Sequence, residues 1–171
     1  MRLFIGIEIE PDNGIRELGG ELKRLGLRTV DEGVLHINLK FLGEVEAGRV
    51  DELKTALDSV KGFGGFEIKL KKVGAFPDDN FIRVIWIGVE SDRIKALESL
   101  ISSELERLGF NKERDYIPHV TLARVPKKTP GVRELLGERE FGTRTVSEVH
   151  LIKSTLGGSG PVYERVHSVR L

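Results

Sequence analysis

The chain of 171 residues contains no cysteine and no glutamine. Without cysteine it can form no disulfide, no thiolate nucleophile and no cysteine-ligated zinc site. No segment approaches the roughly 18 apolar residues that a membrane-spanning helix requires, and the N-terminal segment lacks the features of a signal peptide. We therefore expect a cytoplasmic protein with no membrane partner. The missing cysteine and glutamine, beside 32% charged residues, are typical of proteins from high-temperature organisms.

A net charge is also lacking, because 27 lysine and arginine residues balance 27 aspartate and glutamate residues. A nucleic-acid partner would therefore have to meet a local basic patch, since the protein as a whole has no positive field. The length suits a single domain over residues 1–171 with a substantial core. Balanced charge and the lack of an exposed apolar run predict a monomer with no obligate protein partner.

The spacing of apolar residues predicts the element order βαβαββαβ(α)βββ. Strands are expected at residues 2–8, 36–43, 66–73, 81–89, 118–124 and 162–169, with one bent or two consecutive strands over 141–155. Helices are expected to begin after Pro11, at Val50 and after Ser91, with a short one over 132–136. Residues 74–80 are expected to form a loop. Because each half carries one histidine-bearing strand, we predict an α+β fold with two similar lobes that share a cleft.

Two strands carry the same pattern, His-x-(Thr/Asn)-Leu, about half the chain apart. They read LHINLKFLGE over residues 35–44 and PHVTLAR over residues 118–124. Alternation along a strand puts the polar residues of each segment on the face opposite its apolar stripe. The polar residues are His36, Asn38 and Lys40 in the first segment and His119 and Thr121 in the second; the apolar stripe of the first would be Leu35, Ile37, Leu39 and Phe41. The matched faces predict one site built from both strands.

Other kinds of site find little support in the sequence. A lone histidine in a strand is usually structural, and His150 and His167, which lack the pattern, are interpreted in this way. Neither motif has a third histidine or carboxylate one strand step away, so no metal site is predicted. The G-x-S-x-G turn of serine hydrolases and the glycine-rich loops that bind nucleotide phosphates are both missing.

Two histidines in one cleft suit metal-free cleavage of a phosphodiester. One neutral imidazole accepts a proton from the attacking group, and one protonated imidazole donates a proton to the leaving oxygen. Two such groups titrate as a coupled pair, which predicts a bell-shaped pH–rate profile. Asn38 and Thr121 are predicted to donate hydrogen bonds to the phosphate oxygens. The candidate contacts to the flanking RNA are Lys40, Arg124, Lys127 and Lys128, with Arg124 on the opposite face of its strand unless that strand bulges.

The two motifs resemble the paired His-x-Thr-x signatures of the two-histidine phosphoesterases. The likeness is greatest to the branch called RNA 2′,3′-cyclic phosphodiesterase or 2′-5′ RNA ligase. It extends to the opening RLFIGIEI, the middle GAFPDDNFIRVIWIGV and the tail HLIKSTLGGSGPVYERV, and so covers nearly the whole chain.

This resemblance implies a bilobal α+β fold with a pseudo-twofold axis through an open, positively charged cleft. Each lobe would contain an antiparallel sheet and helices. It implies hydrolysis of terminal 2′,3′-cyclic phosphates on RNA to 2′-phosphates, without a metal or other cofactor, and some members also join RNA ends through a 2′-5′ linkage. In the family's pattern His36 would be the general acid and His119 the base, with Thr121 binding the phosphate.

Asn38 departs from this pattern, because the family usually has threonine there. An amide can still donate to phosphate but is longer, so we expect retained activity with altered substrate preference. Two alternatives stay open: a non-catalytic protein that binds RNA ends on the same fold, and 2′-5′ ligation as the main role. The sequence leaves open whether tRNA fragments or another cyclic phosphate is the substrate.

Overall fold

The computed structural model of the protein describes residues 1–112, 115–158 and 160–171. Its order of helices and strands is the predicted one. In chain order the elements are β1 (Arg2–Glu8), α1 (Asn13–Arg24), β2 (His36–Glu44), α2 (Val50–Asp58), β3 (Phe66–Pro77), β4 (Ile82–Glu90), α3 (Asp92–Glu106), β5 (His119–Arg124), β6 (Gly137–Val146), β7 (Glu148–Gly157) and β8 (Gly160–Arg170). Short 3-10 helices occur at Glu32–Val34, Ala47–Arg49 and Arg133–Leu135.

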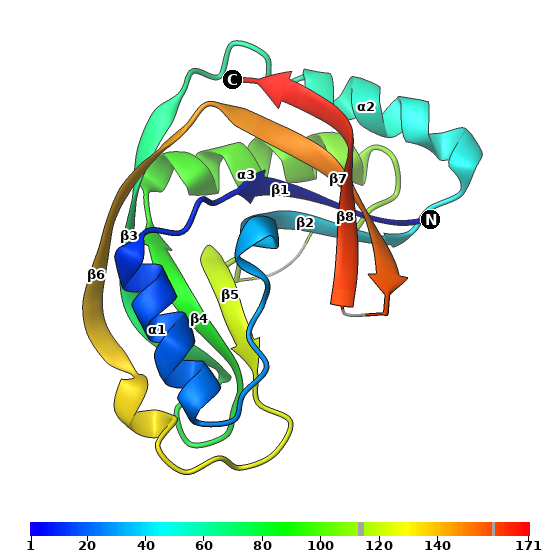
Figure 1. Ribbon diagram of the computed structural model, residues 1–171. Coiled ribbons are helices and arrows are strands. Elements are labelled where there is room, and N and C mark those ends of the chain that lie inside the picture. The colour runs from blue at the N-terminus through cyan, green and yellow to red at the C-terminus, as the bar shows by residue number, and fades with distance from the viewer. Residues whose placement is uncertain (113–114, 159) are drawn as a thin grey trace.

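All eight strands belong to one curled antiparallel sheet in the order β6-β3-β4-β5-β2-β1-β7-β8 (Figure 1). Its two halves meet where β2 pairs with β5, at Ile37 and Val120. The strands that carry the two histidine motifs are therefore adjacent at the centre. The α+β fold with two lobes is confirmed, but the lobes are not the two halves of the chain. The C-terminal strands β7 and β8 extend the sheet beside β1 and β2.

The helices begin and end where capping residues satisfy the backbone. Asp12 accepts a hydrogen bond from the amide of Ile15 at 2.9 Å and caps α1, and Ser91 caps α3. The apolar faces of the two helices are buried in the common core, which also takes in the inward faces of the strands. Helices α2 and α3 pack against each other, α3 contacts β2, and α1 contacts β6 (Figure 1). Across the described residues, no helix has the length and apolar character needed to span a membrane.

The main difference from the predicted boundaries is in β3, which continues through Gly74 to Pro77. The composition of residues 74–80 had indicated a loop. Gly74 pairs with Trp86 of β4, and a Cβ atom at residue 74 would overlap the Trp86 ring. Glycine is therefore required here because the Trp86 side chain packs closely against a strand residue. In the sequence alone, such a glycine looks the same as one that forms a turn.

Candidate active site

The register between β2 and β5 sets the arrangement of the four central motif residues. Ile37 and Val120 are paired antiparallel. In that register His36 lies across from Thr121, and Asn38 lies across from His119, all four on the face opposite the buried Ile37 and Val120. Each histidine is thus placed beside the polar partner of the other motif. The structure therefore brings together the four residues that the sequence assigned to one site.

A bulge in β2 changes the second half of the first motif. Ile5 pairs with Lys40 and Gly6 pairs with Asn38, so Leu39 is an extra residue in β2. Beyond this extra residue, each side chain lies on the face opposite to the one that simple alternation predicts. Lys40 is only 3% exposed and its ammonium donates to the Asn111 carbonyl oxygen, whereas the Phe41 side chain is 44% exposed. The prediction of Lys40 as an RNA contact is therefore wrong, and so is the prediction that Phe41 belongs to the apolar face.

The same bulge occurs in β5. Ile85 pairs with Ala123 and Trp86 pairs with Thr121, so Leu122 is the extra residue. The bulge returns Arg124 to the face of His119, where its side chain is exposed. The sequence places Arg124 on the opposite face of its strand unless that strand bulges, and the structure contains this bulge. Lys127 and Lys128 are exposed in the loop that follows β5.

Both imidazoles are held in the same tautomer. Nδ1 of His36 lies 3.0 Å from the carbonyl oxygen of Val34, and Nδ1 of His119 lies 2.7 Å from that of Ile117. A carbonyl oxygen can only accept, so each Nδ1 carries the hydrogen. In the neutral ring Nε2 is then an unprotonated acceptor, and in the cation it is a donor. Each histidine is therefore ready to move a proton through Nε2.

Aromatic rings enclose each histidine. The His36 ring lies 4.7 Å from the Phe4 ring and 5.3 Å from the Tyr163 ring, measured between centroids. The His119 ring lies 4.9 Å from Phe76 and 6.1 Å from Trp86. These contacts fix the ring planes and remove water from the imidazoles.

Burial is the largest influence on both histidines. It lowers the pKa of His36 and the pKa of His119 below the ordinary value of 6.5. Backbone hydrogen bonds oppose the effect in both cases. The charge of His119 lowers the pKa of His36 further, and the charge of Glu8 raises it. The charge of His119 is thus a minor influence on His36, and burial is the main one.

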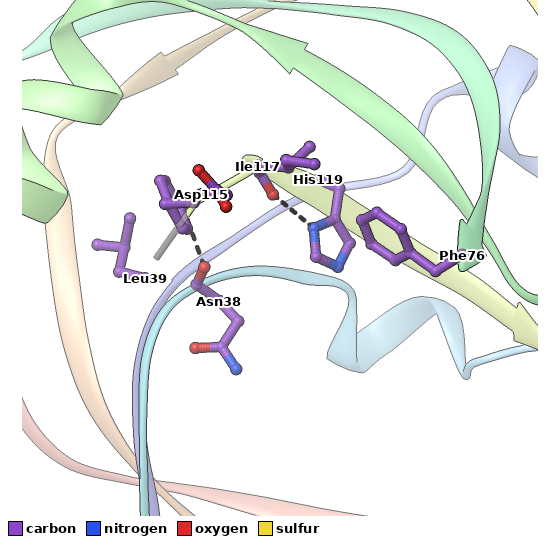
Figure 2. A pocket seen from close by; sticks show the side chains of 7 residues that line it. Asn38, Leu39, Phe76, Asp115, Ile117 and His119 are labelled. Atoms are coloured by element: carbon purple, nitrogen blue, oxygen red, sulfur yellow. Dashed lines mark hydrogen bonds between the residues drawn. The ribbon is translucent and has the colours of Figure 1, made fainter. Parts of the chain in front are cut away.

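A pocket of about 240 Å³ lies beside His119 (Figure 2). It is lined by Asn38, Leu39, Phe76, Asp115, Tyr116, Ile117 and His119. The Tyr116 hydroxyl donates to the backbone oxygen of Asn38 at 3.1 Å and ties the loop before β5 to β2. The side-chain oxygen of Asn38 is buried and has no hydrogen-bond partner among the described residues. Asn38 therefore keeps an unused polar group at the site.

The LigT-like phosphoesterase family model matches the chain twice, over residues 5–86 and 87–163, and each match contains one histidine motif. The chain belongs to the LigT-like phosphoesterase family. A protein of Methanocaldococcus jannaschii named RNA 2′,3′-cyclic phosphodiesterase is 39% identical over 96% of this chain and 97% of its own length. One of Methanothermobacter thermautotrophicus with the same name is 34% identical over 100% and 99%. Thermophilic hosts are thus among the relatives.

Solved structures agree with this membership. The crystal structure of TT0787 of Thermus thermophilus matches with a TM-score of 0.84 at 24% identity, over 100% of this chain and 98% of that one. Escherichia coli LigT complexed with 3′-AMP matches with a TM-score of 0.75 at 25% identity, over 99% and 97%. The resemblance seen in the two motifs is therefore confirmed along the whole chain.

The aromatic environment of this LigT-like site was missed by sequence reasoning, although a second internal repeat signals it. The segment FIGIE over residues 4–8 corresponds to WIGVE over residues 86–90. Each provides the ring beside a histidine and then a glycine. A Cβ at Gly6 would lie 2.9 Å from the Ile37 oxygen, and one at Gly88 would lie 2.6 Å from the Lys71 oxygen. The glycines therefore let neighbouring strands approach closely behind the site.

The other two histidines have partners outside the motif strands. Nδ1 of His150, which is 4% exposed, lies 2.8 Å from the Ser168 hydroxyl. Nε2 of His167 lies 2.7 Å from the Asp58 carboxylate at the end of α2. Within the part of the chain that the structure describes, no three histidine or carboxylate side chains are grouped so that they could share a metal ion.

We expect Gly74→Ala to destabilise the protein, because the new methyl group would overlap the Trp86 ring that packs beside His119. The expected loss is about 1–3 kcal/mol in the free energy of unfolding, typical of an overpacked core. Urea unfolding measures it. Gly19→Ala is the control, since residue 19 lies in α1 with open space around it, and should stabilise by up to about 1 kcal/mol. Equal stability of the Gly74→Ala variant and the wild type would contradict the packing argument.

Proposed function

We propose that this protein hydrolyses 2′,3′-cyclic phosphate ends of RNA to 2′-phosphates, with His36 and His119 as the acid/base pair. One observation carries the proposal: the pairing of β2 with β5 puts both motif imidazoles on one face of the sheet, each with Nδ1 hydrogen-bonded to a carbonyl and Nε2 available. The names of the relatives support the choice of substrate. Residues 1–171 are proposed to act as one two-lobed domain, because β7 and β8 extend the sheet that β1 and β2 begin.

The proposed reaction is an in-line attack of water on the cyclic phosphorus. His119 accepts a proton from the water through Nε2 as the new P–O bond forms. The bond between phosphorus and O3′ breaks, and His36 donates its Nε2 proton to O3′, which leaves a 2′-phosphate. Burial and the charge of His119 lower the pKa of His36, and the Val34 carbonyl and the charge of Glu8 only partly offset them. The assignment of His36 as the acid therefore follows the pattern of the family. Thr121 and Asn38 would donate hydrogen bonds to the non-bridging oxygens, where negative charge increases in the transition state.

Product analysis tests the proposal directly. An oligonucleotide with a 2′,3′-cyclic phosphate end is incubated with the enzyme, with and without EDTA, and the products are separated. We expect a 2′-phosphate at equal rates in both samples. A 3′-phosphate product, full inhibition by EDTA, or binding without turnover between pH 5 and pH 8 would overturn it. The last result would favour the non-catalytic RNA-binding alternative.

The pH dependence follows from the burial of both histidines. In the free enzyme kcat/KM requires one neutral and one protonated imidazole, so it falls on the acid side as the base protonates and on the alkaline side as the acid deprotonates. Because the pKa of each histidine is lowered, both limbs are displaced to lower pH. We expect a bell-shaped profile with its maximum below pH 6.5 and a decline that has already begun at neutrality.

Steady-state rates on a nucleoside 2′,3′-cyclic phosphate measure this profile. The anionic phosphate in the complex favours protonated histidines, so the kcat profile should lie at higher pH than that of kcat/KM. A kcat/KM maximum above pH 7 would contradict the argument from burial.

A further inference from the structure

Lys40 is a buried cation on the face of β2 that points away from the cleft. The bulge in β2 pairs it with Ile5, whose side chain is fully buried, and Lys40 itself is 3% exposed. Three other strand lysines, Lys69, Lys71 and Lys153, each pair with a glutamate, whereas no carboxylate pairs with Lys40 among the described residues. Burying an unpaired ammonium group costs free energy, and a leucine or methionine would pack at this position without that cost. The lysine therefore indicates a specific use of its ammonium group.

The ammonium group of Lys40 holds the loop that joins α3 to β5, over residues 107–118. It donates a hydrogen bond to the carbonyl oxygen of Asn111, in the first half of this α3–β5 loop. In the second half, the Tyr116 hydroxyl donates to the backbone oxygen of Asn38 at 3.1 Å. Lys40 and Asn38 lie on opposite faces of β2, on either side of the extra residue of its bulge. Both halves of the loop are therefore anchored to the same short segment of the first motif.

The α3–β5 loop sets the orientation of His119. Its Ile117 carbonyl oxygen accepts the hydrogen of Nδ1 at 2.7 Å, which leaves Nε2 as the atom that can exchange a proton (Figure 2). The Ile117 side chain is 49% exposed, so packing in the core does not fix this residue. The neighbouring Pro118 is held through its carbonyl oxygen by the amide of Val89 at 3.2 Å. The position of the Ile117 oxygen therefore depends on the anchors of the loop backbone.

The same loop forms one wall of the pocket beside His119, through Asp115, Tyr116 and Ile117. Asp115 has a φ of 56°, in the left-handed region that residues other than glycine adopt infrequently. A backbone of this kind persists where its surroundings hold it. Asp115 lies between the two anchored residues, Asn111 and Tyr116. A looser anchor at Asn111 would therefore affect both the pocket wall and the oxygen behind His119.

We propose that Lys40 is a positioning residue for His119. Its ammonium group holds the α3–β5 loop on β2, and the loop in turn presents the Ile117 carbonyl oxygen to Nδ1 of the imidazole. This role rests on the proposed function, in which His119 moves a proton through Nε2. Misplacing such a group by about 1 Å costs up to about 10²-fold in rate. Lys40 thus acts on the reaction from the buried side of the sheet, without contact with the substrate.

Lys40→Met tests this role, because methionine keeps an unbranched apolar chain in the buried site and removes the donor. We expect kcat on a nucleoside 2′,3′-cyclic phosphate to fall about tenfold, with KM within about threefold of the wild type. The melting temperature should stay the same or rise, because methionine brings no charge into the core and water can bond the carbonyl of the exposed Asn111. Lys40→Gln keeps a neutral donor and should recover part of the lost rate.

The single tryptophan provides a measurement that does not depend on turnover. The Trp86 ring lies 6.1 Å from the His119 ring, and a protonated imidazole at this distance quenches indole fluorescence. A fluorescence titration of the free enzyme therefore follows the protonation of His119, and the transition should be absent from His119→Ala. The Ile117 hydrogen bond raises the pKa of His119 against the effect of burial. In Lys40→Met a looser Ile117 oxygen should lower the midpoint.

The acid limb of the kcat/KM profile should move in the same direction as the fluorescence midpoint. This limb reports the protonation of the base, so a lower pKa of His119 shifts it to lower pH. His36 in the cleft and Asp115 in the pocket are the titratable groups that share the site with His119, and both are the same in the variant and the wild type. A lysine that only supports the core would leave the limb in place.

Lys69→Met is the matched control, because it removes an exposed strand lysine that pairs with Glu140 and should leave kcat and the fluorescence midpoint unchanged. Three results for Lys40→Met would overturn the assignment: a lower melting temperature with unchanged kcat, a higher KM with unchanged kcat, or a loss equal to that of Lys40→Gln. If Lys40→Met does not fold, Lys40→Gln decides: a partial loss of kcat with a lower midpoint supports the role, and wild-type values refute it. Absence of turnover in the wild type would overturn the proposed function instead, and the fluorescence midpoints would still test Lys40.

Discussion

Replacement of either motif histidine by alanine is expected to lower the turnover of a 2′,3′-cyclic phosphate by about 10²–10⁴-fold, the usual contribution of a positioned acid or base. In His36→Ala the leaving O3′ oxygen loses its proton donor, and in His119→Ala the attacking water loses its base. KM should change little, because the phosphate donors remain. Single-turnover rates on a nucleoside 2′,3′-cyclic phosphate measure the loss.

The double variant distinguishes an acid/base pair from two independent groups. The two histidines serve one transition state, so removing both should cost far less than the product of the single losses. His167→Gln is the control, because His167 pairs with Asp58 instead of facing the motif strands. A single-histidine variant with near-normal turnover would contradict the assignment.

Most of the fold could be predicted because its signals are local. Capping residues such as Asp12 and Ser91 start helices through bonds to their own first turns, and alternating apolar residues mark each strand. Local patterns do not indicate which strands pair with each other in the sheet. Strands β7 and β8 join the sheet beside β1, which depends on contacts between the two ends of the chain.

Within the site, local pattern succeeded for the first three residues of each motif and failed after the fourth. Leu39 and Leu122 look like ordinary members of an alternating strand, yet each is the extra residue of a bulge. A bulge is defined by what lies opposite on the partner strand, so alternation alone does not reveal it. The bulge in β2 buries Lys40, and the equivalent bulge in β5 exposes Arg124.

The aromatic rings around the histidines illustrate a third limit. Phe4 and Trp86 come from strands adjacent to the motif strands, and Tyr163 and Phe76 come from more distant ones. Only the register of several strands brings them together. The repeat of FIGIE and WIGVE was visible in the sequence, but its meaning depends on knowing that β1 and β4 occupy equivalent places beside β2 and β5.

Thr121→Val is expected to lower kcat by about 10²–10³-fold, the cost of one lost donor to a developing oxyanion. Valine keeps the branched shape, so the half-buried site in β5 should stay folded with an unchanged melting temperature. The Thr121 hydroxyl has no hydrogen-bond partner within the described chain, which leaves it free to donate to the phosphate. Single-turnover rates measure the loss, and a rate within about threefold of wild type would show that Thr121 is not a phosphate donor.

Asn38→Thr provides the matched comparison, because it installs the residue of the second motif at the equivalent place in the first. The buried side-chain oxygen of Asn38 has no partner in the described part of the protein, so its loss removes no internal hydrogen bond there. We therefore expect turnover to be kept or raised, with a shift in preference among cyclic phosphates. Abolished turnover would show that Asn38 does more than replace a threonine, and would direct attention to its unused oxygen beside His119.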